Sequence, residues 1–199
     1  VVGTSKTAAF FGTSTAALKY RKSIKTDPKL LLAMVIPAFI GSCFGALLAS
    51  NISAQSFKSA IFFMMIAIFF YTLVKPDLGK VQVEKHSPKK LMYIGGAAAF
   101  VIGFYDGLIG PGTGTLLMIF LVAVMGFAFV GASAIAKVVN AMTNLASIIV
   151  VGLGVGILWK IGLFLAFANL AGGYAGSHVA IKKGSGFIRI FYLIVTGLL

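Results

Sequence analysis

Two lysines lie inside apolar, small-residue segments of the sequence, where a charged group needs an explanation. Lys6 stands in VGTSKTAAFF and Lys137 in SAIAKVVNAM. A charged side chain at membrane depth faces a cavity or a partner, whereas one near a helix end extends to the lipid headgroups. Both interpretations are open for each lysine alone. If the two met near the middle of a membrane, they would form a cationic site suited to an anion.

Polar side chains accompany both lysines at helical spacing. Asn140 and Asn144 follow Lys137 by three and seven residues, and Thr13 follows Lys6 by seven. Residues with these spacings share one face of a helix. Their amide and hydroxyl groups could coordinate the oxygens of a substrate, or they could hydrogen-bond neighbouring helices.

A third feature is the stretch GFYDGLIGPGTGT, residues 103–115, which interrupts a long apolar block. It lacks the GK[ST] ending of a phosphate-binding loop. Broken backbone at membrane depth is tolerated where it lines a cavity or is buried in protein, and its free N–H groups attract anions. We therefore predict that Gly110, Gly112 and Gly114 contribute to substrate binding. Asp106 has three open roles: ion pair with a lysine, helix cap, or carrier of a coupling proton.

Composition places these residues in a helical membrane protein. The chain has 199 residues, of which 59% are hydrophobic and 11% charged, and a mean hydropathy of +1.03. Its segments lack the alternating pattern of a membrane β-barrel. The net charge of +13 does not indicate nucleic-acid binding, because the lysines cluster at the ends of apolar runs, as topology signals do. Cys43 is the single cysteine, which excludes an intrachain disulfide and a cysteine metal cluster.

Apolar runs and their breakers predict the membrane-spanning segments. The block 91–126 is too long for one crossing, so it either crosses twice, turning at Gly110-Pro111-Gly112, or combines one crossing with a re-entrant piece. The other predicted spans are 2–18, 29–49, 56–74, 132–156, 158–181 and 187 to the end.

A shift of 131 residues aligns the two halves of the sequence without a gap. It places Lys6 on Lys137 and Thr13 on Asn144. It also pairs two small-xxx-small motifs, which we expect to allow close helix packing: Gly41 and Gly45 with Gly172 and Gly176. Internal repeats of this kind are common in secondary transporters. We predict one transporter domain over 1–199, with a partial first repeat at 1–74, a polar cytoplasmic loop at 75–90 and a second repeat at 91–199.

Loop charges predict that the two repeats are inverted. The loop after the first span carries five basic residues, from Lys19 to Lys29, whereas its counterpart near 152–160 carries Lys160 alone. The next connection reverses this bias, and basic loops are cytoplasmic. The counterpart of GFYDGLIGPGTGT would precede Val1, and the chain stops inside an apolar run. We therefore expect a piece of a longer protein, with a first broken segment missing at its N-terminus.

The stretches GFYDGLIGPGTGT, AKVVNAMTNLASIIV, LAGGYAGSHVAIKKG and VGTSKTAAFFGTSTAALKYRKS together resemble the sulfite exporter TauE/SafE family of membrane transporters, over essentially the whole chain. They are closest to an uncharacterised bacterial branch that carries GFYDG-xx-GP. The resemblance implies a multi-pass protein of the bacterial inner membrane, built from two related halves. It also implies substrates such as sulfite, sulfonates and related organosulfur anions.

The predicted function is therefore secondary transport of a small anion, not catalysis. Lys6 and Lys137 supply charge, and Thr13, Asn140, Asn144, Gly110, Gly112 and Gly114 supply hydrogen bonds. The expected partners are the anion and the lipid bilayer, without nucleic acid, and no cofactor or metal is expected. The alternatives are a passive anion channel with the same cationic cavity and a structural membrane subunit.

Overall fold

Helices make up the structure, a computed structural model, and none of its described residues is in a strand. The described residues are 2–49, 66, 70, 73–74, 78–83, 85–154 and 158–198. The helices are α1 (Val2–Ser23), α2 (Pro28–Ala49), α4 (Pro88–Leu108), α5 (Thr113–Ala123), α6 (Phe129–Gly154) and α7 (Trp159–Leu198). The all-helical prediction is confirmed; the predicted span 56–74 lies almost entirely outside the described residues.

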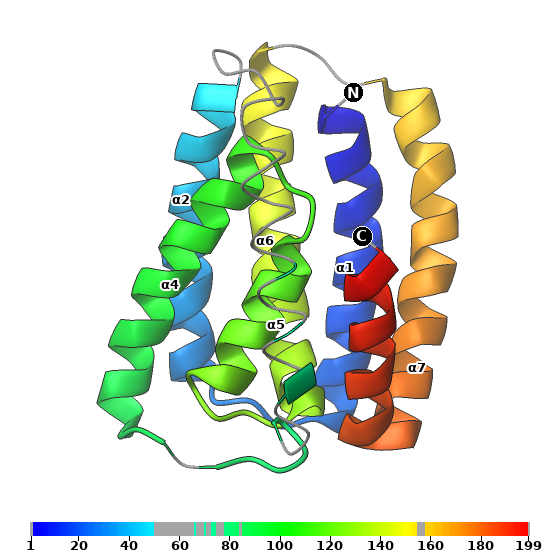
Figure 1. Cartoon of the computed structure of the whole chain (residues 1–199). Helices are drawn as coiled ribbons and strands as arrows, with labels where there is room; N and C mark the ends of the chain where they lie inside the picture. The colour runs from blue at the N-terminus through cyan, green and yellow to red at the C-terminus, as the bar shows by residue number, and fades with distance from the viewer. Residues whose placement is uncertain are drawn as a thin grey trace.

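Three described helices are long and apolar enough to cross a membrane: α2, α4 and the Phe129–Gly152 part of α6. The predicted span 2–18 forms α1, but α1 is not among them, because its sequence is rich in threonine, serine and glycine and holds Lys6. Instead, α1 lies between α6 and α7 in the bundle (Figure 1). Such a helix fits a membrane protein when neighbouring helices cover its polar side chains.

The apolar block 91–126 divides at the glycine-rich stretch, as its length predicts. It contains α4, with 21 residues, and α5, with 11 residues. At 1.5 Å per residue α5 is about 16 Å long, roughly half of the ~30 Å hydrocarbon thickness. The chain reverses direction between the two helices (Figure 1). Of the two arrangements predicted for this block, the lengths favour one crossing followed by a short returning piece.

Helix α6 lies at the centre of the bundle and packs against α1, α2, α4, α5 and α7. Its inward face carries the fully buried Ile135 and Val139, which belong to one core with Leu117 and Leu121 of α5. Because α1 and α5 both contact α6, the segment with Lys6 and the segment after the glycine-rich turn are held around one central helix.

Helices α2 and α4 approach each other so closely that only glycine fits at four positions. A Cβ at Gly41 or Gly45 of α2 would collide with the carbonyl oxygen of Phe100 or Phe104 on α4. Gly103 and Gly107 of α4 meet the backbone of α2 in the same way. The small-xxx-small interpretation therefore holds in the first half. For Gly172 and Gly176, nothing among the described residues lies within 4 Å of a built Cβ.

Figure 1 shows that the helices paired by the 131-residue shift run in opposite directions. The chain descends along α1 and ascends along α6; it ascends along α2 and descends along the first part of α7. Helix α7 then reverses at Gly184, which has φ 77° and ψ −173°, and ascends again, so it holds both of the last two predicted spans. One end of the bundle gathers the loop after α1, the start of α4 and the bend at Gly184, which all carry lysine or arginine.

We predict that Gly45→Ala destabilises the protein and that its repeat counterpart Gly176→Ala does not. The Gly45 methyl would collide with backbone of α4, and overpacking of this kind costs about 1–3 kcal/mol, whereas a methyl at Gly176 meets open space. Thermal unfolding in detergent, read by size-exclusion chromatography, measures both variants. Equal melting temperatures for the two would contradict the close α2–α4 packing.

Candidate functional site

The glycine-rich turn is built from backbone conformations that other residues rarely adopt. Gly110 has φ +93° and Gly112 has φ +82°, both in the left-handed region. The turn is fastened by Tyr105, whose hydroxyl donates to the carbonyl of Pro111, and by the N–H of Thr113, which donates to the carbonyl of Gly110 at 3.3 Å. The turn therefore ends α4 and starts α5 at a defined place beside α1.

A buried ion pair joins α1 to this turn. The Lys6 Nζ lies 2.7 Å from the Asp106 carboxylate oxygen Oδ1 and also donates to the Asp106 backbone carbonyl at 2.7 Å. Lys6 is 5% exposed and Asp106 is 1% exposed. The end of the lysine lies against Gly110, where a Cβ would stand 3.0 Å from Nζ. Of the three roles left open for Asp106, ion pairing with a lysine is present in the structure.

Thr113 completes the cluster around Asp106. Its hydroxyl oxygen lies 2.7 Å from Asp106 Oδ1 and 2.7 Å from the carbonyl oxygen of Gly110. The second carboxylate oxygen, Oδ2, is buried and has no hydrogen-bond partner among the described residues. Asp106 thus ties together α1, α4 and α5. It does not cap α5, whose N-cap is Gly112.

Lys137 lies in a different environment, on the wall of a cavity of about 300 Å³. The cavity is bounded by the turn and α5 on one side and by the last part of α7 on another. Its lining includes Gly112, Gly114 and Thr115 from the turn, Asn140 one helical turn after Lys137, and Tyr192 from α7. Lys137 is half-buried, and none of the described residues that line the cavity is acidic. A cation with amide, hydroxyl and backbone groups around it can bind a small anion.

The two asparagines of α6 belong to one hydrogen-bond chain. The Asn144 amide nitrogen donates to the Asn140 side-chain oxygen at 3.2 Å, and the Thr143 hydroxyl donates to the Asn140 backbone carbonyl at 3.0 Å. Asn140 lines the cavity, whereas Asn144 is 2% exposed and lies behind it. Asn144 therefore orients the side-chain amide of Asn140. The amide nitrogen of Asn140 lies on the side of Gly114, where an added Cβ would be 3.5 Å from it.

Six of the eight predicted site residues thus fall into two adjacent groups on either side of the glycine-rich turn, and Thr13 and Asn144 belong to neither. Lys137, Asn140, Gly112 and Gly114 share the cavity, and Lys6 and Gly110 are with Asp106. The Thr13 hydroxyl donates within its own helix, to Ala9 at 2.8 Å. Sequence reasoning missed Thr113, because contacts across an irregular turn follow no helical spacing. It also missed the G-xxx-G of Gly103 and Gly107, which the sequence does display.

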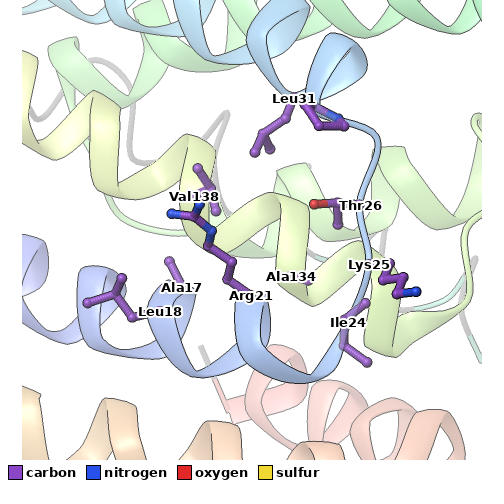
Figure 2. A pocket seen from close by; sticks show the side chains of 10 residues that line it. Ala17, Leu18, Arg21, Ile24, Lys25, Thr26, Leu31, Ala134 and Val138 are labelled. Carbon is purple, nitrogen blue, oxygen red and sulfur yellow. The ribbon is translucent and has the colours of Figure 1, made fainter.

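A second cavity, of about 540 Å³, opens where α1 ends and α2 begins (Figure 2). Arg21 extends from α1 toward Val138 of α6, and Lys25 and Thr26 come from the connecting loop. Val138 directly follows Lys137 in the sequence but lies on another face of α6. The larger cavity is therefore separate from the Lys137 cavity and belongs to the basic end of the bundle.

Apolar helices of membrane-spanning length surrounding a broken helix and buried charges define an integral membrane protein, and the comparisons place it among transporters. The chain matches the family described as "Sulfite exporter TauE/SafE" over residues 1–199, and it belongs to that family. No solved structure matches the chain.

Its relatives carry consistent names. The chain is 33% identical to "Probable membrane transporter protein ORF9" of Sinorhizobium sp, over 98% of this chain and 74% of that protein. It is 33% identical to a "Probable membrane transporter protein" of Haemophilus influenzae, over 98% and 76%. It is 30% identical to "Probable membrane transporter protein YfcA" of Escherichia coli K12, over 100% and 73%. Family and names point to a transporter rather than an enzyme.

We predict that Asp106→Ala strongly destabilises the protein, and that adding Lys6→Met restores much of the loss. Removing one partner of a buried ion pair leaves an uncompensated charge, at a cost of about 3–5 kcal/mol, whereas removing both charges avoids that cost. Unfolding of both single variants and the double variant in detergent measures the coupling. Strictly additive losses would mean that the two side chains do not interact.

Proposed function

We propose that this transporter carries small anions, with sulfite, sulfonates and related organosulfur anions as its substrate class. The observation that carries the proposal is the Lys137 cavity, whose described lining residues include a cation and no acidic side chain. An anion there would meet the ammonium group of Lys137, the amide of Asn140 and the backbone of Gly112 and Gly114. The family description, which names sulfite export, supports the chemical class.

Lys6 is the second cation of the proposed site, but in this conformation the Asp106 carboxylate neutralises it. We therefore assign direct charge complementarity first to Lys137 and assign Gly110 and Lys6 to the adjacent wall. Asn144 supports Asn140, and Thr13 stabilises α1 through its local hydrogen bond. Because Lys137 is the one charged residue among the described residues that line the cavity, the site favours monovalent over divalent anions.

Transport by alternating access requires two groups of helices that move against each other, and the helix packing supports an inverted repeat that supplies them. Gly173 of α7 meets the backbone of Gly12 on α1. Under the 131-residue shift, Gly173 corresponds to Ser42 and Gly12 corresponds to Thr143. These two residues are also in contact, because the Ser42 hydroxyl donates to the Thr143 backbone carbonyl at 2.8 Å. Helix α1 therefore packs on the repeat counterpart of α2, and α6 packs on α2 itself. Together with the opposite helix directions, these paired contacts support a pseudo-two-fold relation between the two halves.

The distribution of basic side chains supports an orientation. The end of the bundle with Arg21, Lys25, Lys89, Lys182 and Lys183 would face the cytoplasm, because basic loops are retained there. The 540 Å³ cavity opens at this end, where Arg21 and Lys25 would attract anions toward the protein. We propose the bacterial inner membrane as its location, as for a family with bacterial members.

We predict that Lys137→Ala abolishes anion transport while the protein still folds. Loss of the ammonium group leaves the cavity with polar groups but no positive charge, and a charge-assisted contact is worth about 1.5–3 kcal/mol, a factor of roughly 10–150 in affinity. Uptake of radiolabelled methanesulfonate and sulfite into proteoliposomes measures the effect, and the exposed Lys160→Ala is the matched control. Unchanged uptake by Lys137→Ala would overturn the site.

The same proteoliposomes distinguish a carrier from a passive anion channel. A carrier saturates with substrate and shows counterflow, in which unlabelled anion on one side drives labelled anion to accumulate from the other. A flux that rises linearly with concentration and shows no counterflow would assign the cavity to a channel.

A further inference from the structure

The cluster around Asp106 contains more hydrogen-bond acceptors than protons to fill them. The Thr113 hydroxyl lies 2.7 Å from two acceptors, Asp106 Oδ1 and the Gly110 carbonyl, but a hydroxyl group has one proton to donate. Asp106 Oδ2 is buried without a donor among the described residues. Buried polar atoms in folded proteins are normally paired, so an unpaired carboxylate oxygen at this depth needs a reason.

One added proton would complete this hydrogen-bond chain. If the carboxyl oxygen facing Thr113 carried it, Asp106 would donate to the Thr113 hydroxyl oxygen, and Thr113 would donate to the Gly110 carbonyl. The new O–H bond on Oδ1 is the only covalent bond that forms, and the hydrogen bond between Oδ1 and Thr113 reverses its direction. Oδ2 then belongs to a neutral acid, and burying it without a donor costs less than burying a carboxylate oxygen. The charge of the Lys6–Asp106 pair rises from zero to +1, because the Lys6 ammonium group loses its counter-ion.

Among the described residues, no other carboxylate lies around Asp106 to take this role, and Tyr105 is the neighbouring titratable group on α4 itself. Helix α5 has no charged residue, α2 contributes Lys29 and Cys43 as titratable groups, and α6 contributes Lys137. Lys6 from α1 is the charged group in contact. The chain has four acidic residues in all, and the other three, Asp27, Asp77 and Glu84, lie in polar connecting segments of the sequence.

We propose that Asp106 binds a proton, and that this proton releases Lys6 to bind the transported anion at the glycine-rich turn. The proposal rests on the proposed anion transport and adds its coupling ion. The turn is the physical link, since Gly110 touches Lys6, and Gly112 and Gly114 line the Lys137 cavity two and four residues later. A proton and a monovalent anion then bind together with no net change in charge, which makes them cosubstrates.

The first measurement detects the proton without any anion. Infrared difference spectroscopy of the purified protein records the carbonyl stretch of a protonated carboxyl group as the pH falls from about 8 to about 5, a range in which solvated carboxylates stay ionised. We expect one such band in the wild type and in the matched control Asp27→Asn, and its loss in Asp106→Asn. If the band is absent from the wild type or persists in Asp106→Asn, the inference is wrong.

The second measurement tests coupling through the affinity for methanesulfonate, which stays a monoanion over this pH range. One-proton linkage tightens wild-type binding by up to about tenfold per pH unit on acidification. Asp106→Asn presents an amide N–H to Thr113, as the protonated acid would present its O–H. This variant should therefore bind at every pH at least as tightly as the wild type does at low pH. If Asp106 had a purely structural role, Asp106→Asn would bind methanesulfonate more weakly than the wild type at all pH values, and the pH dependence of binding would be unchanged.

The two measurements separate this inference from the function on which it rests. An infrared band that is lost in Asp106→Asn, with no methanesulfonate or sulfite binding at any pH, would keep the proton site and refute anion transport. Tight but pH-independent wild-type binding would keep anion transport and refute the coupling. If Asp106→Asn does not fold, Lys6→Met replaces it: loss of the ammonium group should move the infrared titration to higher pH, and an unmoved titration would overturn the proposal.

Discussion

The contact between Lys6 and Asp106 is the interaction on which the arrangement of this bundle depends. An isolated charge inside apolar helices costs several kilocalories per mole, so each side chain is tolerable only because the other is there. Their 2.7 Å approach requires α1 to lie against the last turn of α4, which holds Asp106. Because the helix ends there, the N–H of Gly110 donates to Tyr105, and the Asp106 backbone carbonyl accepts from Lys6. Helix α1, the break after Leu108 and the start of α5 are therefore positioned by one electrostatic requirement.

Close packing of α2 on α4 places the Asp106 carboxylate within reach of Lys6. Asp106 stands between Gly103 and Gly107, whose missing side chains let the backbones of the two helices touch. Larger residues there would push α4 outward and take Asp106 away from α1. The same contact buries Ser42, which hydrogen-bonds the Thr143 carbonyl of α6. Glycines that look like helix breakers in the sequence thus hold the acidic residue at a fixed distance from the centre of the bundle.

The sequence alone was enough to predict the class of fold and the break at the glycine-rich stretch, because long apolar runs and clustered glycines are strong local signals. It could not show that Lys6 pairs with Asp106, because the two are 100 residues apart and no periodicity links them. It also did not separate Asn140 on the cavity wall from Asn144 behind it, since both lie on the face of α6 that carries Lys137. Which of several polar residues on one helix face lines a cavity depends on how the neighbouring helices pack against that face.

The repeat relation between Lys6 and Lys137 makes their different surroundings informative. Equivalent positions in two inverted halves would have equivalent partners if the halves were equal in sequence. Among the described residues, Lys6 contacts the Asp106 carboxylate, whereas the residues that line the Lys137 cavity include no acidic side chain. A site for anions needs a cation that the substrate can neutralise. In the proposal, a second cation that is paired with its own acid becomes available to the substrate when that acid binds a proton. In the proposed mechanism, Lys137 therefore supplies the charge that the anion meets, and the Lys6–Asp106 pair supplies the site of the proton.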